Sequence, residues 1–324
     1  MTFYIGVDIG GTNIKAGVVD GTGRIVGESS SPTGADRPQE VVLGDILQAV
    51  ENAVSASGVS IRDIRAAGVG SPGAVDSETG TVLYNYNLGW RNFAIGPMMS
   101  EALEMPVRLE NDANAAALGE VVAGSAKGAS SAMVITLGTG IGSGFVIDGN
   151  IWTGYNSSAC EFGHMVIVCG GRPCTCGRRG CFEAYASASG LIAMTKEAIA
   201  ANPDSGLSRL AHREGDVVSG HTPFDAAEAG DPVARRVVDE YVGYLACGLA
   251  NLINGLQPEV ISIGGGIGKQ GERLLAPLRR RVTEETFGER TEGEKMTRLV
   301  SCTLGYKAGL IGAAMAGASV LFRG

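Results

Sequence analysis

Residues 7–21, VDIGGTNIKAGVVDG, decide the fold, because residues 135–149, ITLGTGIGSGFVIDG, repeat their pattern. In both stretches an apolar strand leads into a Gly/Thr turn, a second strand follows, and an Asp-Gly pair closes the unit. The identities are few but well placed: Gly10 matches Gly138, and Asp20-Gly21 match Asp148-Gly149. The sequence therefore predicts two related halves that each open with a hairpin.

The two turns are candidate phosphate sites. Gly10 and Gly11 let backbone N–H groups approach a phosphate with no side chain in the way, and Thr12 and Thr139 add hydroxyls. Asp8 is placed to hold Mg²⁺, most simply through water. An ordinary glycine-rich hairpin explains the first turn equally well when it is taken alone. The pair of turns favours a cleft in which two domains hold a polyphosphate.

Residues 158–184 contain a cluster of metal-ligand residue types. Cys174, Cys176 and Cys181 fall within eight residues and His164 precedes them by ten, a set that favours four-coordinate Zn²⁺. The alternatives are a disulfide or inert cysteines. A Cys-x-Cys spacing is cramped for a bridge, and the chain has seven cysteines, an odd number. Three thiolates and one imidazole close the metal shell, so this zinc is expected to be structural.

Carboxylates flank the cysteine cluster and a strand end. Glu161 and Glu183 lie beside the expected zinc knuckle, which indicates that the metal holds polar groups toward a small hydroxylated ligand. Asn111 and Asp112 follow a short apolar strand, at the expected start of a helix. Helix capping is one role for this pair. Asp112 has a second role open to it, accepting the proton of a substrate hydroxyl that attacks phosphorus.

Three further loops carry weaker signals. The turn Ser71-Pro72-Gly73 places backbone where it could meet a ligand. Asn87 could bond a hydroxyl and Trp90 could stack on a sugar, although a surface loop with a buried Trp anchor is the simpler interpretation. Gly265 and Gly266 follow a strand and precede a helix, an arrangement in which a nucleotide can lie against backbone.

Composition sets the class of protein. The 324 residues are 44% hydrophobic with mean hydropathy +0.14, enough for cores in two domains. A net charge of −8 and a pI near 5.1 argue against a nucleic-acid partner. The N-terminus lacks a basic segment followed by an apolar one, and no run of about 18 apolar residues occurs. We therefore expect a cytoplasmic protein with reduced thiols and no membrane partner.

Apolar periodicity places the remaining elements. Short apolar runs predict strands, and helical spacing predicts helices, the last of which should return across the first domain. The predicted strands are 3–8, 13–19, 65–70, 107–109, 260–263 and 299–300, and the predicted helices are 41–57, 187–201, 208–211, 223–229, 232–255, 272–282 and 308–322.

The combination of DIGGT, NDANAAALGE, LGTG, EFGH, CTCGRRGCFE and GGG resembles the ROK family of sugar kinases, and within it the zinc-containing bacterial glucokinases. The resemblance covers essentially the whole chain. It implies an α/β, actin-like ATPase (ribonuclease H-like) fold with an ATP and sugar cleft between two domains. Residues 1–119 with the C-terminal helix 308–324 would form one domain, and residues 120–307 the other.

The resemblance also implies roles for individual residues. Asp112 would be the general base on the 6-hydroxyl of glucose, and the zinc ligand His164 would bond the sugar through its second nitrogen. ATP, Mg²⁺ and a structural Zn²⁺ would be the cofactors. The sugar ligands would be Asn111, Glu161, His164 and Glu183, with Gly73 and Asn87 lining the pocket; the phosphate turns would be Gly10–Thr12 and Gly138–Gly140, with Asp8 serving Mg²⁺ and Gly265-Gly266 lying near the adenosine.

Alternatives within and beyond the family remain. Family repressors carry a helix-turn-helix domain ahead of the first phosphate strand, whereas only Met1 and Thr2 precede it here, so a DNA-binding role is not expected. Polyphosphate-using relatives lack the cysteine knuckle. The runner-up substrates are N-acetylmannosamine, N-acetylglucosamine, mannose and fructose, and a sugar-sensing regulator without turnover is less expected because Asp8 and Asp112 are intact. A homodimer or homotetramer is expected.

Overall fold

The computed structural model describes residues 2–34, 37–85, 88–288 and 295–322, so Asn87 lies outside the described residues. Contacts divide the chain into two compact units. Unit 1 comprises Met1–Val134, Gly144–Cys160 and Thr303–Gly324, and unit 2 comprises Ile135–Ser143 and Glu161–Cys302. The domain bounds expected from the sequence, with a division at 119/120, stay a prediction.

The first sheet carries the first glycine turn. Its strand order is β3-β2-β1-β4-β8, with β1 antiparallel to β2 and parallel to β4. Asp8 on β1 lies opposite Lys15 on β2. The strands are β1 (Phe3–Ile9), β2 (Asn13–Asp20), β3 (Ile25–Pro32), β4 (Ile64–Ser71) and β8 (Val107–Asn111).

The second sheet repeats the topology of the first. Its order is β11-β10-β9-β12-β13. When the five strands of each sheet are numbered along the chain, both sheets have the order 3-2-1-4-5. The outer pairs agree as well, since β10–β11 is antiparallel and β12–β13 is parallel, like β2–β3 and β4–β8. The strands are β9 (Ser131–Leu137), β10 (Ile141–Ile147), β11 (Asn150–Ile151), β12 (Val260–Gly264) and β13 (Arg298–Ser301). This confirms the two related halves predicted from the repeated hairpin.

A small third sheet, β5-β6-β7, extends unit 1. Its strands are β5 (Ala74–Asp76), β6 (Thr81–Asn85) and β7 (Trp90–Phe93). Trp90 is only 1% exposed and meets Phe93 edge to face, with ring centroids 5.0 Å apart. Trp90 is therefore the buried anchor of its loop, and the prediction that it stacks on a sugar is wrong, because its ring faces are covered by protein.

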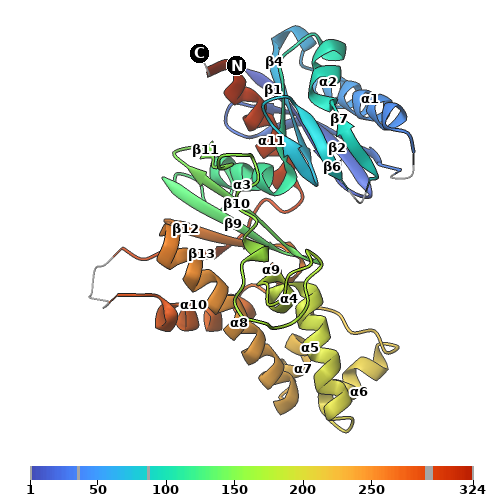
Figure 1. Ribbon diagram of the computed structural model, residues 1–324. Helices are drawn as coiled ribbons and strands as arrows, with labels where there is room; N and C mark the ends of the chain where they lie inside the picture. The colour runs from blue at the N-terminus through green and yellow to red at the C-terminus, as the bar shows by residue number, and fades with distance from the viewer. Residues whose placement is uncertain (1, 35–36, 86–87, 289–294, 323–324) are drawn as a thin grey trace. The chain divides into compact units, whose positions relative to one another are not determined.

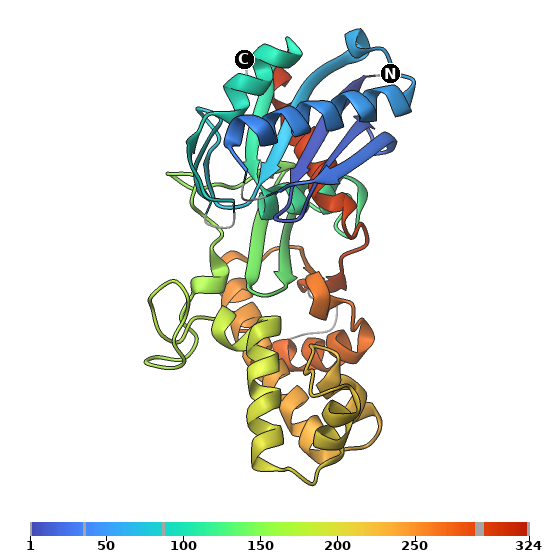
Figure 2. The same ribbon diagram turned by 90° about the vertical axis from the view of Figure 1, so that its right-hand side faces the viewer.

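Helices cover both faces of the first sheet (Figures 1 and 2). α1 (Gln39–Ser57) packs on β2 and β3 and ends at Gly58, whose φ of 67° is left-handed. α11 (Lys307–Ser319) lies on the opposite face against β1 and β4, as expected for the returning C-terminal helix. Its approach is close, because a Cβ on Gly68 would come within 1.8 Å of the Ala313 carbonyl oxygen. α2 (Ile95–Leu103) and α3 (Asp112–Ala123) complete the helices of unit 1.

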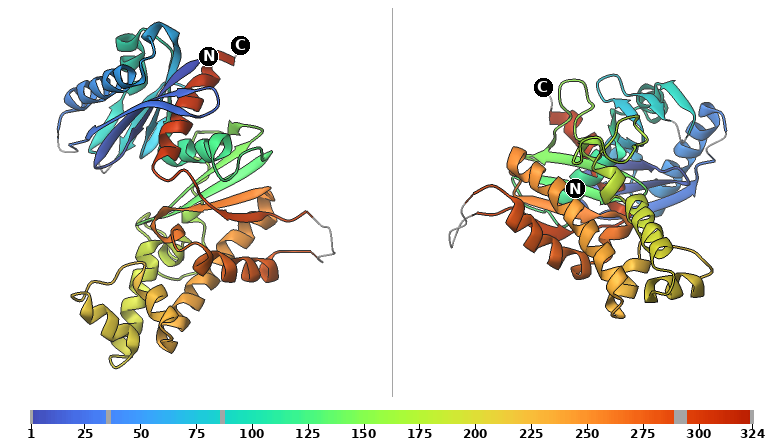
Figure 3. Two further views of the ribbon diagram at one scale, coloured as in Figure 1. Left: turned by 180° about the vertical axis from the view of Figure 1, so that it is seen from behind. Right: turned by 60° about the horizontal axis from the view of Figure 1, so that its bottom comes forward.

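Unit 2 consists largely of helices. The long helix α8 contacts α4, α5, α6, α7 and α10, and the helices gather around it in Figure 3. The helices of unit 2 are α4 (Glu183–Ala186), α5 (Ala188–Ala201), α6 (Gly206–Arg213), α7 (Thr222–Glu228), α8 (Pro232–Leu256), α9 (Gly265–Gly268) and α10 (Glu272–Glu285). Among the described residues, none of the helices has the length and apolar character needed to span a membrane.

A buried carboxylate fastens α3 to the segment that leads into α11. Glu120, 1% exposed, accepts hydrogen bonds from the backbone N–H groups of Thr303 (3.0 Å) and Leu304 (2.9 Å). It also accepts from the N–H and hydroxyl of Ser125 at 2.7 and 2.8 Å. Donors from two chain segments far apart in sequence thus converge on one carboxylate, which orders both.

Removing this carboxylate should cost stability. Glu120→Ala is expected to lower the free energy of unfolding by about 3–5 kcal/mol, because the backbone N–H groups of Ser125, Thr303 and Leu304 lose their common acceptor. Glu120→Gln should lose less, since its amide oxygen still accepts. Urea unfolding followed by circular dichroism measures both. Glu101→Ala, at an exposed position, is the control and should stay within about 0.5 kcal/mol of wild type. Equal stability of Glu120→Ala and Glu101→Ala would contradict this role.

Candidate active site and metal centre

The turn between β1 and β2 is shaped by a few backbone contacts. The Gly10 N–H donates to the Asn13 carbonyl at 2.9 Å, and the Thr33 hydroxyl and N–H donate to the carbonyls of Gly10 and Thr12 at 2.7 and 2.9 Å. Gly11 and Thr12 are exposed. The predicted phosphate turn therefore has its carbonyls held by the protein and its tip free to meet a ligand.

Several predicted binding glycines are not required by the protein's own packing. A Cβ on Gly11 or Gly266 would meet nothing within 4 Å, and one on Gly138 would meet only the Gly140 carbonyl oxygen at 3.9 Å. None of these residues has a positive φ. Neither sterics nor backbone conformation demands glycine at these positions, so each leaves open space into which a ligand could come close to the backbone.

Asp8 and Asp112 are two carboxylates of unit 1 whose charges interact. Burial raises the pKa of Asp8 to about 6; the charge of Lys15 opposes this shift and the charge of Asp112 adds to it. Asp8 also lies against α11, since a Cβ on Gly309 would come within 2.9 Å of its carboxyl carbon. Two carboxylates whose charges interact in this way are of the residue type that binds Mg²⁺ in proteins.

Asp112 occupies the first turn of α3, at the carboxyl end of β8. Desolvation raises its pKa, and the Ala113 N–H, 2.9 Å from its Oδ1, opposes that shift. A carboxylate with a raised proton affinity, at the end of a parallel strand, has the character of a general base.

The Asn111 side chain has a structural task. It caps α3 by accepting the N–H of Ala113 at 2.9 Å and of Asn114 at 3.3 Å, as the capping interpretation predicts. Its amide nitrogen also donates to the Gly73 carbonyl at 3.2 Å. The fold thus brings the predicted residues Gly73, Asn111 and Asp112 together at one corner. Gly73 has a φ of 96°, the left-handed region in which glycine is favoured.

The second glycine turn is joined to the cysteine knuckle by Glu183. The Glu183 carboxylate accepts the N–H of Ile141 at 2.8 Å, directly after the turn 138–140. Gly140 is needed for this approach, because a Cβ there would come within 2.2 Å of the Glu183 Oε2. Within the turn, the Gly138 N–H donates to the Gly140 carbonyl at 3.0 Å. Predicted phosphate and sugar residues are therefore in contact within unit 2.

His164, Cys174, Cys176 and Cys181 form a cage whose ligand atoms all lie within 4.8 Å of one another. The Sγ atoms of Cys176 and Cys181 are 3.7 Å apart, and the Cys174 Sγ lies 3.6 Å from the His164 Nδ1. Zn–S and Zn–N bonds of about 2.3 and 2.0 Å at tetrahedral angles give separations of about 3.8 and 3.5 Å. The cage therefore fits zinc, and the distances exclude a disulfide, whose S–S bond is about 2.05 Å.

Local backbone pairing builds the cage. Isolated bridges join Val166 to Cys181 and Pro173 to Arg179, which folds the knuckle back on the segment that follows His164. All seven cysteines are free of disulfides. Burial raises the pKa of Cys181 to about 12, whereas the Arg178 N–H lowers that of Cys176.

The structure also shows where the predicted residues Glu161, His164 and Gly265 lie. His164 ends the short 3-10 helix η2 (Phe162–His164), and Glu161 precedes it with its side chain exposed. Gly265, with a φ of 79°, begins α9 directly after β12, as expected for a turn at the end of a strand. Sequence reasoning missed Glu110 and Glu120, which are both buried at 1% exposure. Glu120 ends the stretch NDANAAALGE (111–120) and Glu110 directly precedes it, so closeness in sequence to Asp112 was the signal available.

The sequence profile described as "ROK family" matches residues 4–318, nearly the whole chain. The chain belongs to the ROK family. A glucokinase of Halalkalibacterium halodurans is 38% identical over 311 residues, which cover 96% of this chain and 93% of the relative.

Two solved structures of ROK family proteins are similar to this chain over nearly its whole length. A ROK family glucokinase from Streptomyces griseus, in complex with glucose and AMPPNP, shares 36% identity with a TM-score of 0.78, covering 98% of this chain and 99% of that one. A ROK hexokinase from Thermus thermophilus shares 33% identity with a TM-score of 0.81, covering 100% of both. The chain accordingly has the α/β fold of the actin-like ATPases expected from the sequence.

Proposed function

We propose that this ROK protein transfers the γ-phosphoryl group of ATP to the 6-hydroxyl of glucose. One observation carries the proposal: relatives named glucokinase match more than 90% of the chain at 36–38% identity. The Streptomyces griseus relative was solved with glucose and an ATP analogue, which supports the same pair of substrates here.

In the proposed reaction Asp112 accepts the proton of the sugar 6-hydroxyl as that oxygen attacks the γ-phosphorus. The bond from phosphorus to the bridging oxygen breaks, and ADP leaves. The raised pKa of Asp112 supports this role, because a stronger base takes the proton more readily. The turns 10–12 and 138–140 hold phosphates through backbone N–H groups other than those of Gly10 and Gly138, which donate to the carbonyls of Asn13 and Gly140. Gly265 and Gly266 lie by the adenosine.

Two metal ions complete the proposal. Asp8 would hold Mg²⁺, whose charge would offset that of the phosphates, and the cage at His164 would hold a structural Zn²⁺. Glu161, Glu183, Asn111 and His164 bind sugar hydroxyls. Because the Nδ1 of His164 faces Cys174, its Nε2 is the nitrogen left to bond the sugar, which couples the metal cage to sugar orientation.

A coupled assay of ADP release against a panel of hexoses tests the substrate. Saturable turnover with glucose, well above that with mannose, fructose, N-acetylglucosamine or N-acetylmannosamine, is the expected result. A higher kcat/KM for another hexose would make that hexose the substrate and leave the kinase reaction unchanged. Glucose binding without turnover of any sugar would overturn the kinase proposal in favour of a sugar sensor.

Gly11→Ala separates ligand binding from folding. Its Cβ would enter open space, so the melting temperature should be unchanged, whereas the KM for ATP should rise at least about tenfold because the methyl group occupies phosphate space. Gly68→Ala is the converse control. Its Cβ would clash with α11 and should lower stability by about 2 kcal/mol or more. A Gly11→Ala enzyme with an unchanged KM for ATP would remove this turn from the phosphate site.

A further inference from the structure

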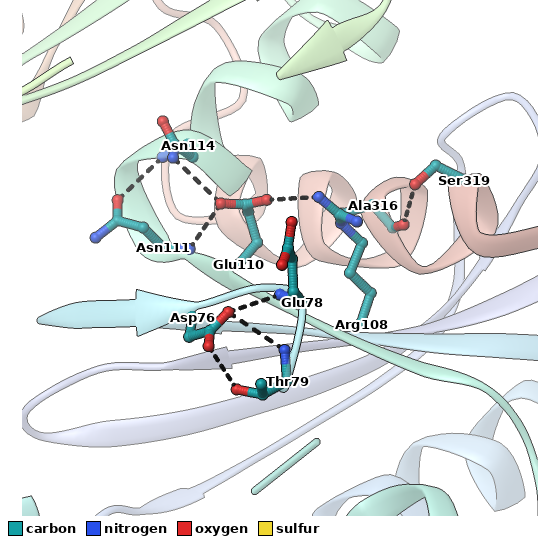
Figure 4. Close-up of polar contacts among 9 residues, drawn as sticks. All are labelled: Asp76, Glu78, Thr79, Arg108, Glu110, Asn111, Asn114, Ala316 and Ser319. Carbon is teal, nitrogen blue, oxygen red and sulfur yellow. Dashed lines mark hydrogen bonds and ion pairs between the residues drawn. The ribbon is translucent and has the colours of Figure 1, made fainter. Parts of the chain in front are cut away.

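Glu110 is a buried carboxylate two residues before Asp112. Figure 4 shows its contacts with Arg108, Asn111 and Asn114. Glu110 is 1% exposed, on β8, and the backbone N–H of Asn111 donates to its Oε1 at 3.1 Å. The side-chain amide of Asn114, in the first turn of α3, donates to the same oxygen at 3.2 Å. The Arg108 guanidinium meets the other oxygen, Oε2, at 3.3 Å.

These contacts hold both sides of the corner. The Asn111 N–H belongs to the last residue of β8, whereas Asn114 belongs to α3, so a single oxygen of Glu110 ties the strand to the helix. Asp112 lies between the two donors along the chain. The Asn111 side chain makes a second, separate tie, because its Oδ1 accepts N–H groups of the helix and its amide nitrogen donates to the Gly73 carbonyl.

Burying the charge of Glu110 costs free energy that its contacts must offset. A buried carboxylate is costly unless it is paired and hydrogen-bonded, and replacing such a network with apolar groups is often neutral or stabilising. Arg108 is itself largely buried, with its side chain 11% exposed, so the ion pair has little contact with water. A fold needing only stability could use an apolar residue here, whereas a base that must keep its direction needs a rigid corner.

We propose that Glu110 is a positioning residue for the phosphoryl-transfer reaction: by accepting from Asn111 and Asn114 it fixes the direction in which Asp112 presents its carboxylate. The proposal rests on Asp112 being the general base. Glu110 acts through the backbone and touches neither substrate, so its loss should impair turnover more than substrate binding.

The experiment compares four variants of the full chain by steady-state kinetics and thermal unfolding. Glu110→Ala should lower kcat about 10–100-fold with the KM values for glucose and ATP within about threefold, because a displacement near 1 Å of a reacting group costs this much. Glu110→Gln keeps an oxygen that accepts from both donors and should stay within about threefold of wild-type kcat. Leu109→Ala, the neighbouring residue on the same strand but in the apolar core, should lower the melting temperature without changing the kcat of the folded enzyme.

Asp112→Asn separates the two proposals. If it retains near-normal turnover, Asp112 is not the base, so the premise of the Glu110 proposal fails while the kinase activity stands; a folded wild-type chain that turns over no sugar would instead overturn the proposed function. If Asp112→Asn is inactive but folded Glu110→Ala keeps wild-type kcat, only the role of Glu110 is overturned. A kcat loss in Glu110→Gln equal to that in Glu110→Ala, or a matching loss in Leu109→Ala, also overturns it, because neither follows from hydrogen-bonded positioning.

Discussion

Asp112→Asn should lower kcat by about 10²–10⁴-fold while glucose affinity changes less than about threefold. Asparagine matches the shape of the side chain but cannot take the proton of the attacking hydroxyl. Its amide oxygen can still accept the Ala113 N–H, which lies 2.9 Å from Asp112 in the native chain, so the corner should keep its structure. Kinetics at saturating ATP, with glucose binding measured by calorimetry, gives both quantities.

Asp231→Asn is the matched control for that experiment. Asp231 also sits at a helix start and accepts the Ala234 N–H at 2.7 Å, but it caps α8 and has no role in the proposed reaction. Its asparagine variant should keep kcat within about twofold, because asparagine caps helices as well as aspartate does. Near-normal turnover by Asp112→Asn would remove Asp112 from the base role.

Cys176→Ser should reduce zinc content from near one ion per chain and raise the KM for glucose about 10–100-fold. The cage loses one of the sulfurs that define it, and the His164 ring is then held only by its other contacts. Metal analysis of the purified protein and glucose kinetics on the same preparation measure the two effects together.

Cys169→Ser tests whether position in the cage matters. Cys169 belongs to the same knuckle and is exposed, but it is not among the clustered ligand atoms, so its serine variant should keep both zinc and glucose KM. A metal-free Cys176→Ser enzyme with wild-type KM for glucose would separate the metal from sugar binding. Zinc loss in Cys169→Ser would show that the ligand set is wrong.

Local patterns in the sequence predicted a large part of this molecule. The repeated hairpin predicted two related halves, because apolar runs and glycine turns specify hairpins over short range, and the matching strand order of the two sheets confirms that prediction. The cysteine spacing predicted the cage at His164, since ligands close in sequence need only a tight knuckle to converge. Helix ends were less accurate: the predicted helix 208–211 is α6 (Gly206–Arg213), which begins at a Ser205 cap.

Burial and long-range partners could not be derived in this way. The carboxylates of Glu110 and Glu120 look like surface acids in the sequence, and only the structure shows them buried. Their donors lie on other elements, as when Thr303 bonds Glu120.

By itself, the sequence determined the glycine turns, the set of metal-ligand residues and the candidate base, because these depend on residue types at short, fixed spacings, and it determined the fold class through its resemblance to the ROK family. Only the tertiary structure decided which acids are buried and what holds the Asp112 corner. The physical reason is that desolvation and hydrogen-bond geometry arise from neighbours that the chain brings together only on folding.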